Sequence, residues 1–137
     1  MERLKQCLVS ACLTGLCTRY DGRSKPHADC LQLLTGFQWI PVCPEQLGGL
    51  PTPRPPCNLV NGDGYGVLAG TAQVIDLHGT DRSEAFIRGA FMVLAIAQAQ
   101  NISLCFLKSR SPSCGLSPLI GVTAALLQHH GIEVVSF

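Results

Sequence analysis

Cysteine is the residue type in this chain best suited to chemistry, because eight of its residues are cysteines. Three of them stand in similar surroundings, each near glycine or proline and each after an apolar segment: Cys12 after residues 7–11, Cys43 after 37–42 and Cys114 after 102–107. Thiolates bind zinc or iron–sulfur clusters, so three cysteines that converge would form a metal site. Buried free thiols are the alternative that spacing alone leaves open.

These apolar segments are predicted to be strands, and helical segments separate them. We expect strands over 7–11, 37–42, 73–77, 102–107 and 132–135, and helices over 28–34, 81–100 and 118–131. This alternation predicts an α/β fold, a Rossmann-like domain over residues 1–137 with a mostly parallel sheet. The carboxyl ends of such strands lie along one edge, where ligands bind, and the three cysteines can meet there.

Two further segments interrupt this alternation. Residues 43–56 are so rich in proline and glycine that a loop is predicted, because proline disfavours both helices and central strands. Long ordered loops in compact domains are usually functional. Residues 58–68 are predicted to form a small hairpin that turns at Asn61-Gly62-Asp63-Gly64.

Composition restricts the classes of protein to consider. Apolar residues make up 47% of the chain and charged residues 14%, which favours a packed core. The formal net charge of +1 argues against a nucleic acid polymer as partner.

No run approaches the roughly 18 apolar residues of a membrane span. The segment Val9-Ser10-Ala11-Cys12 is similar to a lipoprotein cleavage box, but the apolar stretch before it is too short for a signal peptide. Several cysteines lie in apolar runs, so we expect reduced thiols and a cytoplasmic protein.

Four longer motifs carry a resemblance to a known family. They are SACLTG at 10–15, PVCPE at 41–45, GGLPTPR at 48–54 and KSRSPSCG at 108–115. With these motifs the chain resembles the bacterial thiouracil desulfurases over essentially its whole length, through GVTAALL at 121–127.

The resemblance implies a function and a cofactor. It implies a [4Fe–4S] cluster held by Cys12, Cys43 and Cys114, with one iron left open, and roles in catalysis for Glu45 and Ser111. The implied reaction removes sulfur from thiouracil-type pyrimidines and gives uracil and hydrosulfide. The open iron would act as a Lewis acid on the thiocarbonyl group, without net redox change. The implied partner is therefore a small molecule, a thiolated pyrimidine supplied as base, nucleoside or nucleotide.

Two other functions stay open at the level of sequence. One is a module that carries an iron–sulfur cluster for binding or sensing, without turnover. The other is a hydrolase with Cys43 or Cys114 as its nucleophile, although no histidine partner for Cys43 is evident in the sequence.

Some residues near the three cysteines have two interpretations. Cys17 is either a fourth ligand, which would close the cluster, or a residue that packs behind it. Four basic residues fall in loops at the expected active edge, where they would bind a substrate phosphate or cap backbone carbonyls: Arg19, Arg54, Lys108 and Arg110.

Overall fold

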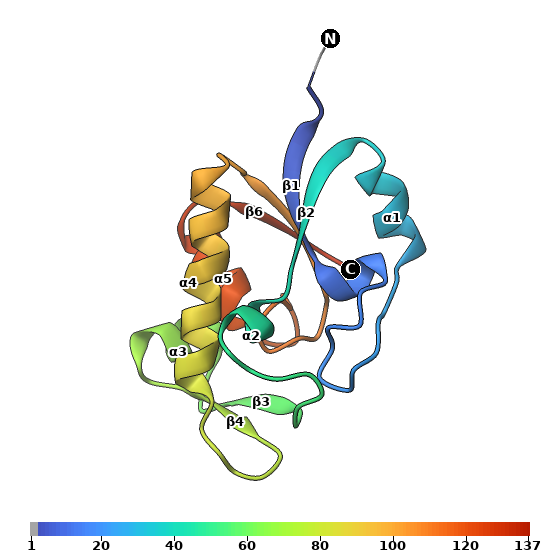
Figure 1. The fold of residues 1–137 in the computed structure, drawn as a ribbon. Helices are drawn as coiled ribbons and strands as arrows, with labels where there is room; N and C mark the ends of the chain where they lie inside the picture. Colours follow the sequence, from blue (N-terminus) through green and yellow to red (C-terminus); the bar gives the residue numbers. More distant parts are fainter. Residues whose placement is uncertain (1–2) are drawn as a thin grey trace.

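A parallel sheet of four strands forms the centre of the molecule. The computed structural model describes residues 3–137 and places the strands in the order β2-β1-β5-β6, all parallel (Figure 1). The strands are β1 (Lys5–Ser10), β2 (Phe37–Val42), β5 (Leu104–Leu107) and β6 (Glu133–Ser136). The mostly parallel α/β architecture predicted from the sequence is therefore confirmed.

Helices cover both faces of the sheet. Side chains alternate along β1, so that Leu8 packs into the cluster that contains α4 (Ser83–Ala99) and α5 (Val122–His129). Cys7 and Val9 point the other way and pack with α1 (Ala28–Leu34). Figure 1 shows α4 and α5 on one side of the sheet and α1 on the other. Burial from both sides explains the continuous apolar run of β1.

The short helix α2 (Pro44–Leu47) lies unusually close to α4. A Cβ atom added to Gly89 would lie 1.9 Å from the backbone oxygen of Pro44. A Cβ atom added to Gly48 would likewise lie 2.0 Å from the backbone oxygen of Ala85. Glycine on both surfaces therefore permits backbone contact between the two helices, and α4 fixes the place of α2.

The small antiparallel pair of strands expected beside the main sheet is present, but it does not lie within residues 58–68. The strand β3 (Cys57–Val60) pairs antiparallel with β4 (Gln73–Asp76), and the helix α3 (Gly64–Ala69) lies between them in sequence. The Asp63 side chain accepts a hydrogen bond from the backbone N–H of Gly66 at 3.0 Å, which caps α3. The turn at Asn61-Gly62 therefore leads into a helix and not into a returning strand.

Two other boundaries differ from the sequence prediction. The proline-rich segment 43–56 contains the helix α2, which Pro44 begins because a helix needs no N–H at its first position. The helix expected from Pro118 begins only at Val122. Ahead of it, the backbone N–H of Gly121 donates to the oxygen of Gly115 at 2.7 Å, which ties this loop to the segment that carries Cys114. No helix among residues 3–137 has the length and apolar character that crossing a membrane requires.

Candidate functional site

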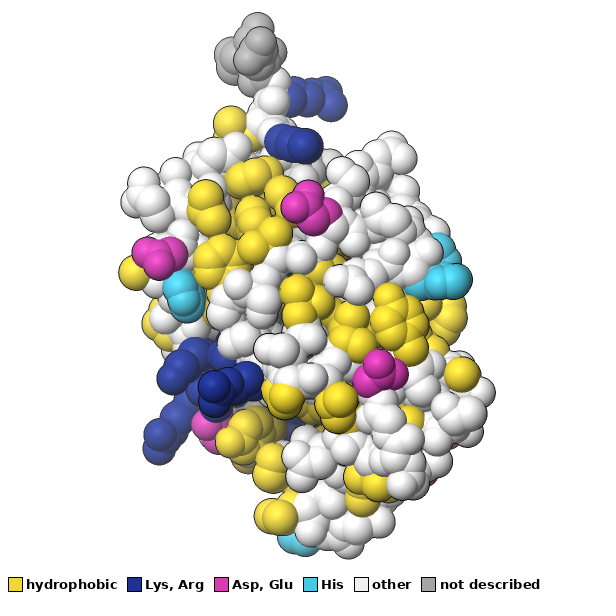
Figure 2. Space-filling model, turned by 180° about the vertical axis from the view of Figure 1, so that it is seen from behind, with side chains coloured by type: hydrophobic (Ala, Val, Ile, Leu, Met, Phe, Trp, Pro, Cys, Tyr) yellow, Lys and Arg dark blue, Asp and Glu magenta, His cyan; other side chains and the backbone are white. Residues whose placement is uncertain are grey.

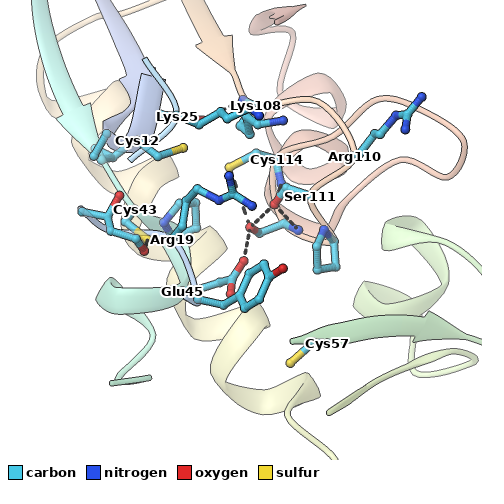
Figure 3. A pocket seen from close by; sticks show the side chains of 18 of the residues that line it. Cys12, Arg19, Lys25, Cys43, Glu45, Cys57, Lys108, Arg110, Ser111 and Cys114 are labelled. Carbon is cyan, nitrogen blue, oxygen red and sulfur yellow. Dashed lines mark hydrogen bonds between the residues drawn. The ribbon is translucent and has the colours of Figure 1, made fainter. Parts of the chain in front are cut away.

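The three predicted cysteines meet at the carboxyl edge of the sheet. Cys12 lies in the 3-10 helix η1 (Ala11–Thr14) directly after β1, Cys43 caps α2 directly after β2, and Cys114 lies in the loop after β5. All three line one pocket with a volume of about 360 Å³, and Figure 3 shows their sulfur atoms directed into the same space. The topology thus brings together thiols that lie far apart in the sequence.

Burial and neighbouring charges shift the pKa values of the cysteine thiols. Burial raises the pKa of Cys12, and the charge of Cys43 raises it further, whereas Lys108 and Arg19 lower it. Burial also raises the pKa of Cys114, to about 12. An uncompensated thiolate is costly in such a place, so a cationic metal centre is the natural partner for these sulfurs.

Hydrogen bonds to Cys114 act in the opposite direction to burial. The hydroxyl groups of Ser10 and Ser113 lower its pKa, whereas the charges of Cys43 and Cys12 raise it. The Ser113 hydroxyl lies 3.7 Å from the Cys114 sulfur. Ser10 also accepts a hydrogen bond from the backbone N–H of Lys108 at 2.9 Å, which joins the ends of β1 and β5 beside the thiols.

Among residues 3–137, no three His, Cys, Asp or Glu side chains gather closely enough to hold a single metal ion. A polynuclear cluster needs more widely spaced thiols than a single ion does, because each cysteine ligates a different iron.

Cys57 also lines the pocket but lies apart from the other thiols in Figure 3. Cys17 is exposed and is not among the pocket-lining residues, so its alternative role as a fourth ligand loses support.

Glu45 projects from α2 into the pocket, and both of its carboxylate oxygens are bonded. Oε1 accepts a hydrogen bond from Nε of Arg54 at 3.0 Å. Oε2 accepts one from the hydroxyl of Ser113 at 3.0 Å. The Ser113 hydroxyl in turn lies 2.9 Å from that of Ser111 (Figure 3). Four residues from three segments therefore form one hydrogen-bonded chain beside the cysteines.

Ser111 shapes the loop that carries Cys114. Its hydroxyl oxygen accepts hydrogen bonds from the backbone N–H groups of Ser113 at 3.2 Å and Cys114 at 3.1 Å. Such a turn fixes the direction of the backbone on which Cys114 sits. Ser111 therefore has a structural function in addition to the catalytic role that the family resemblance implies.

Basic side chains line the rest of the pocket. Burial lowers the pKa of Lys108, and the charges of Arg19, Lys25 and Arg110 lower it further, while the thiolate of Cys12 raises it. All four cations line the pocket, and Figure 2 shows Lys and Arg side chains gathered together on the face opposite to that in Figure 1. A group of cations that repel one another favours an anionic ligand.

Several pocket-lining residues were not predicted from the sequence, among them Lys25, Tyr20 and Ser113. Lys25 and Tyr20 lie in the loop that follows Cys12, where nothing in the local sequence separates ligand-binding residues from ordinary loop residues. Ser113 stands inside the Ser-Pro-Ser-Cys motif next to Cys114, so the motif itself contained the signal. Arg54 departs from the other predicted cations, because its side chain is buried and caps carbonyl oxygens.

Comparison with known proteins gives consistent matches. The family model described as 2-thiouracil desulfurase matches residues 7–136. The chain is 38% identical to the uncharacterized protein YbbK of Bacillus subtilis (strain 168), over 94% of this chain and 93% of YbbK. It is also similar to the solved structure of the [4Fe-4S]-dependent thiouracil desulfidase TudS, with a TM-score of 0.77 and 37% identity, covering 96% of this chain and 90% of that one.

Proposed function

The chain belongs to the 2-thiouracil desulfurase family, and from this membership and the pocket we propose that it is an enzyme that removes sulfur from thionated pyrimidines. The reaction replaces the thiocarbonyl sulfur by oxygen from water and releases hydrosulfide, so no electrons are gained or lost. The observation that carries the proposal is the convergence of three thiols beside a carboxylate in one pocket. Reduced thiols and a cluster of this kind fit a cytoplasmic location.

Cys12, Cys43 and Cys114 are the residues proposed to hold a [4Fe–4S] cluster, the cofactor on which TudS depends. They fit it because they come from separate segments, line one pocket and are thiols, the ligands that iron–sulfur clusters take. With three protein ligands, the cluster would supply an iron that is free to act as a Lewis acid toward the thiocarbonyl sulfur.

Glu45 is proposed as the acid–base group. Each carboxylate oxygen carries a second lone pair beyond the one that Arg54 or Ser113 occupies, so Glu45 retains an acceptor for a proton of water. It can accept that proton as the water oxygen attacks the thiocarbonyl carbon, and return a proton to the departing sulfur or to the ring. Ser111 is proposed to act through Ser113, because its hydroxyl can donate to that of Ser113, which in turn donates to Glu45.

The cations support a phosphorylated form of the substrate. Lys108, Arg19, Lys25 and Arg110 line the pocket together, and a free thiouracil base has no negative charge that would use them all. A nucleoside monophosphate places a dianion about one sugar away from the base, and lysine and arginine both bind phosphate well. We therefore propose thionated nucleotides as better substrates than the free base.

The alternative of a cysteine hydrolase finds little support in the pocket. A nucleophilic cysteine is normally a thiolate, and burial instead raises the pKa of Cys114 to about 12. No histidine is among the pocket-lining residues, as far as residues 3–137 are concerned, so the usual base for an activated thiol is missing from this site.

The test is an anaerobic assay of hydrosulfide release by the cluster-loaded protein, with 2- and 4-thiouracil and their nucleosides and nucleotides as substrates. We expect release from wild type and a loss of about 100-fold or more in Glu45→Gln, because general acid–base catalysis typically contributes that much. Glu133→Gln, which alters an exposed carboxylate of β6 outside the pocket, is the matched control and should be unaffected.

Two results would point to other functions. A protein that is fully loaded yet releases no sulfide from any of these substrates would favour a sensing module. Activity that survives removal of iron and is abolished by thiol alkylation would favour a cysteine hydrolase.

A further inference from the structure

Arg54 is a buried arginine that makes several hydrogen bonds besides its ion pair with Glu45. Only 4% of its side chain is exposed. Its backbone N–H donates to the oxygen of Tyr20 at 2.8 Å, so both its main chain and its side chain join the 51–54 segment to the loop after Cys12. It therefore lies where the two loops meet in the wall of the pocket.

All five N–H groups of the Arg54 guanidinium have an acceptor. Nε donates to Glu45 Oε1 at 3.0 Å. Nη1 donates to the oxygen of Pro51 at 3.2 Å and to Oγ1 of Thr52 at 2.8 Å. Nη2 donates to the oxygen of Thr18 at 3.0 Å and faces the sulfur of Cys43 at 3.9 Å. Because a guanidinium has five N–H donors, none remains for a substrate.

Ser113 holds the other side of the same carboxylate. It is 2% exposed, and its hydroxyl donates to Glu45 Oε2 at 3.0 Å. Glu45 is therefore fixed at both oxygens by two buried groups that come from different loops. A carboxylate held at one oxygen can still rotate about its terminal bond, whereas one held at both cannot.

We propose that Arg54 and Ser113 are positioning residues that together orient Glu45 toward the reacting carbon, and that Arg54 also donates a hydrogen bond to the Cys43 sulfur. Arg54 would then connect the acid–base group with a ligand of the cluster. This inference rests on the proposed function, in which Glu45 moves protons and Cys43 binds iron. In this proposal both residues act through Glu45 and not on the substrate directly.

The chemistry of arginine explains why this residue type stands here. Its planar fork reaches several acceptors in fixed directions at once, whereas a lysine ammonium is a point charge on a flexible chain. Placement matters because a misplacement of about 1 Å can cost a factor of about 100 in rate. Hydrogen bonds to cluster sulfurs also set the reduction potential of an iron–sulfur cluster, so the contact with Cys43 has a readout that is independent of turnover.

The experiment compares the cluster-loaded variants Arg54→Gln, Arg54→Lys and Ser113→Ala with wild type. The control is Arg82→Gln, because Arg82 pairs with Asp76 through Nε at 3.1 Å in the same way, outside the pocket. For each protein the iron and sulfide content, kcat and KM for a thionated pyrimidine, and the reduction potential of the cluster are measured.

We expect Arg54→Gln and Ser113→Ala to keep the cluster and the KM of wild type while kcat falls about 100-fold. Arg54→Lys should recover only part of kcat. The potential should become more negative in Arg54→Gln than in wild type, since a cationic donor to Cys43 is lost, and should not move in Arg82→Gln.

Several outcomes would overturn the inference. Unchanged kcat in Ser113→Ala and Arg54→Gln would show that Glu45 does not need to be held at both oxygens. Ser113→Ala tests this even where the Arg54 variants do not fold. A loss of activity that only follows a loss of iron would reduce both residues to structural support. If loaded wild type releases no sulfide, the proposed function fails, and an unshifted potential in Arg54→Gln would then separately refute the contact with Cys43.

Discussion

Replacing Gly89 by alanine tests how α4 positions the site from outside the pocket. Gly89 lies in the interior of α4, and its surface touches the backbone of Pro44, which stands between Cys43 and Glu45. A methyl group at this position would push against the segment that carries both residues. We therefore expect Gly89→Ala to damage activity, although Gly89 does not line the pocket.

The structure gives the size of this effect. The added Cβ would lie 1.9 Å from the Pro44 oxygen, and real Cβ atoms essentially never approach within 3.0 Å, so α2 and α4 must separate. Overpacking of this kind costs about 1–3 kcal/mol in stability. Movement of Glu45 by about 1 Å would lower kcat by about 100-fold. Without this contact, Gly89→Ala should instead raise the stability, because alanine stabilises a helix interior by about 1 kcal/mol relative to glycine.

The assay combines thermal or urea unfolding with hydrosulfide release, measured on the same loaded samples. Gly36→Ala is the matched control, since a Cβ there would lie at an ordinary 3.7 Å from the oxygen of Leu33. A Gly89→Ala protein that is more stable than wild type and equally active would refute the close contact between α2 and α4 and the reasoning built on it.

Three further outcomes are expected at single residues. Ser111→Ala should lower the free energy of unfolding by about 1–3 kcal/mol, because two backbone N–H groups lose their acceptor, and an unchanged urea midpoint would show that this turn does not need the hydroxyl. The pKa of Lys108 is lowered by burial, so its charge is lost earlier than usual as the pH rises. If Lys108 binds the phosphate, the KM for a thionated nucleotide should therefore increase toward alkaline pH. Lys108→Arg, which stays charged, should flatten this profile. Identical pH profiles of wild type and Lys108→Arg would exclude phosphate binding by Lys108. Cys17→Ser should retain the iron content of wild type, because Cys17 is exposed outside the pocket, and loss of iron would restore it as a ligand.

The sequence predicted the parts of the fold that depend on local patterns. Short apolar runs were enough to predict β1 and β2, and the helical spacing of apolar residues was enough to predict α4. The prediction failed at residues 58–68, where Asn61-Gly62 is as suitable for a hairpin as for the start of a helix. Gly64, the first residue of α3, packs against a distant segment: a Cβ there would lie 2.2 Å from the oxygen of Gly121, a contact that no local pattern reveals.

The candidate site was predictable only in part, for a similar reason. Parallel strands place their carboxyl ends at one edge, so the meeting of Cys12, Cys43 and Cys114 in one pocket followed from topology. The role of Arg54 did not follow, because a basic residue in a loop can face a ligand or cap carbonyl oxygens equally well. Its burial and its five acceptors depend on how two distant loops pack, which no local pattern contains.

Cluster binding by the three thiols is the claim on which the rest depends, and the metal content of cysteine variants tests it most directly. Iron and acid-labile sulfide are counted after anaerobic reconstitution of wild type, of Cys12→Ala, Cys43→Ala and Cys114→Ala, and of Cys57→Ala, whose thiol lines the same pocket but lies apart from the others. We predict one [4Fe–4S] cluster per chain in wild type and Cys57→Ala, and a large loss in each of the other three. Full loading of any of those three variants, or failure of wild type to bind iron, would contradict the claim.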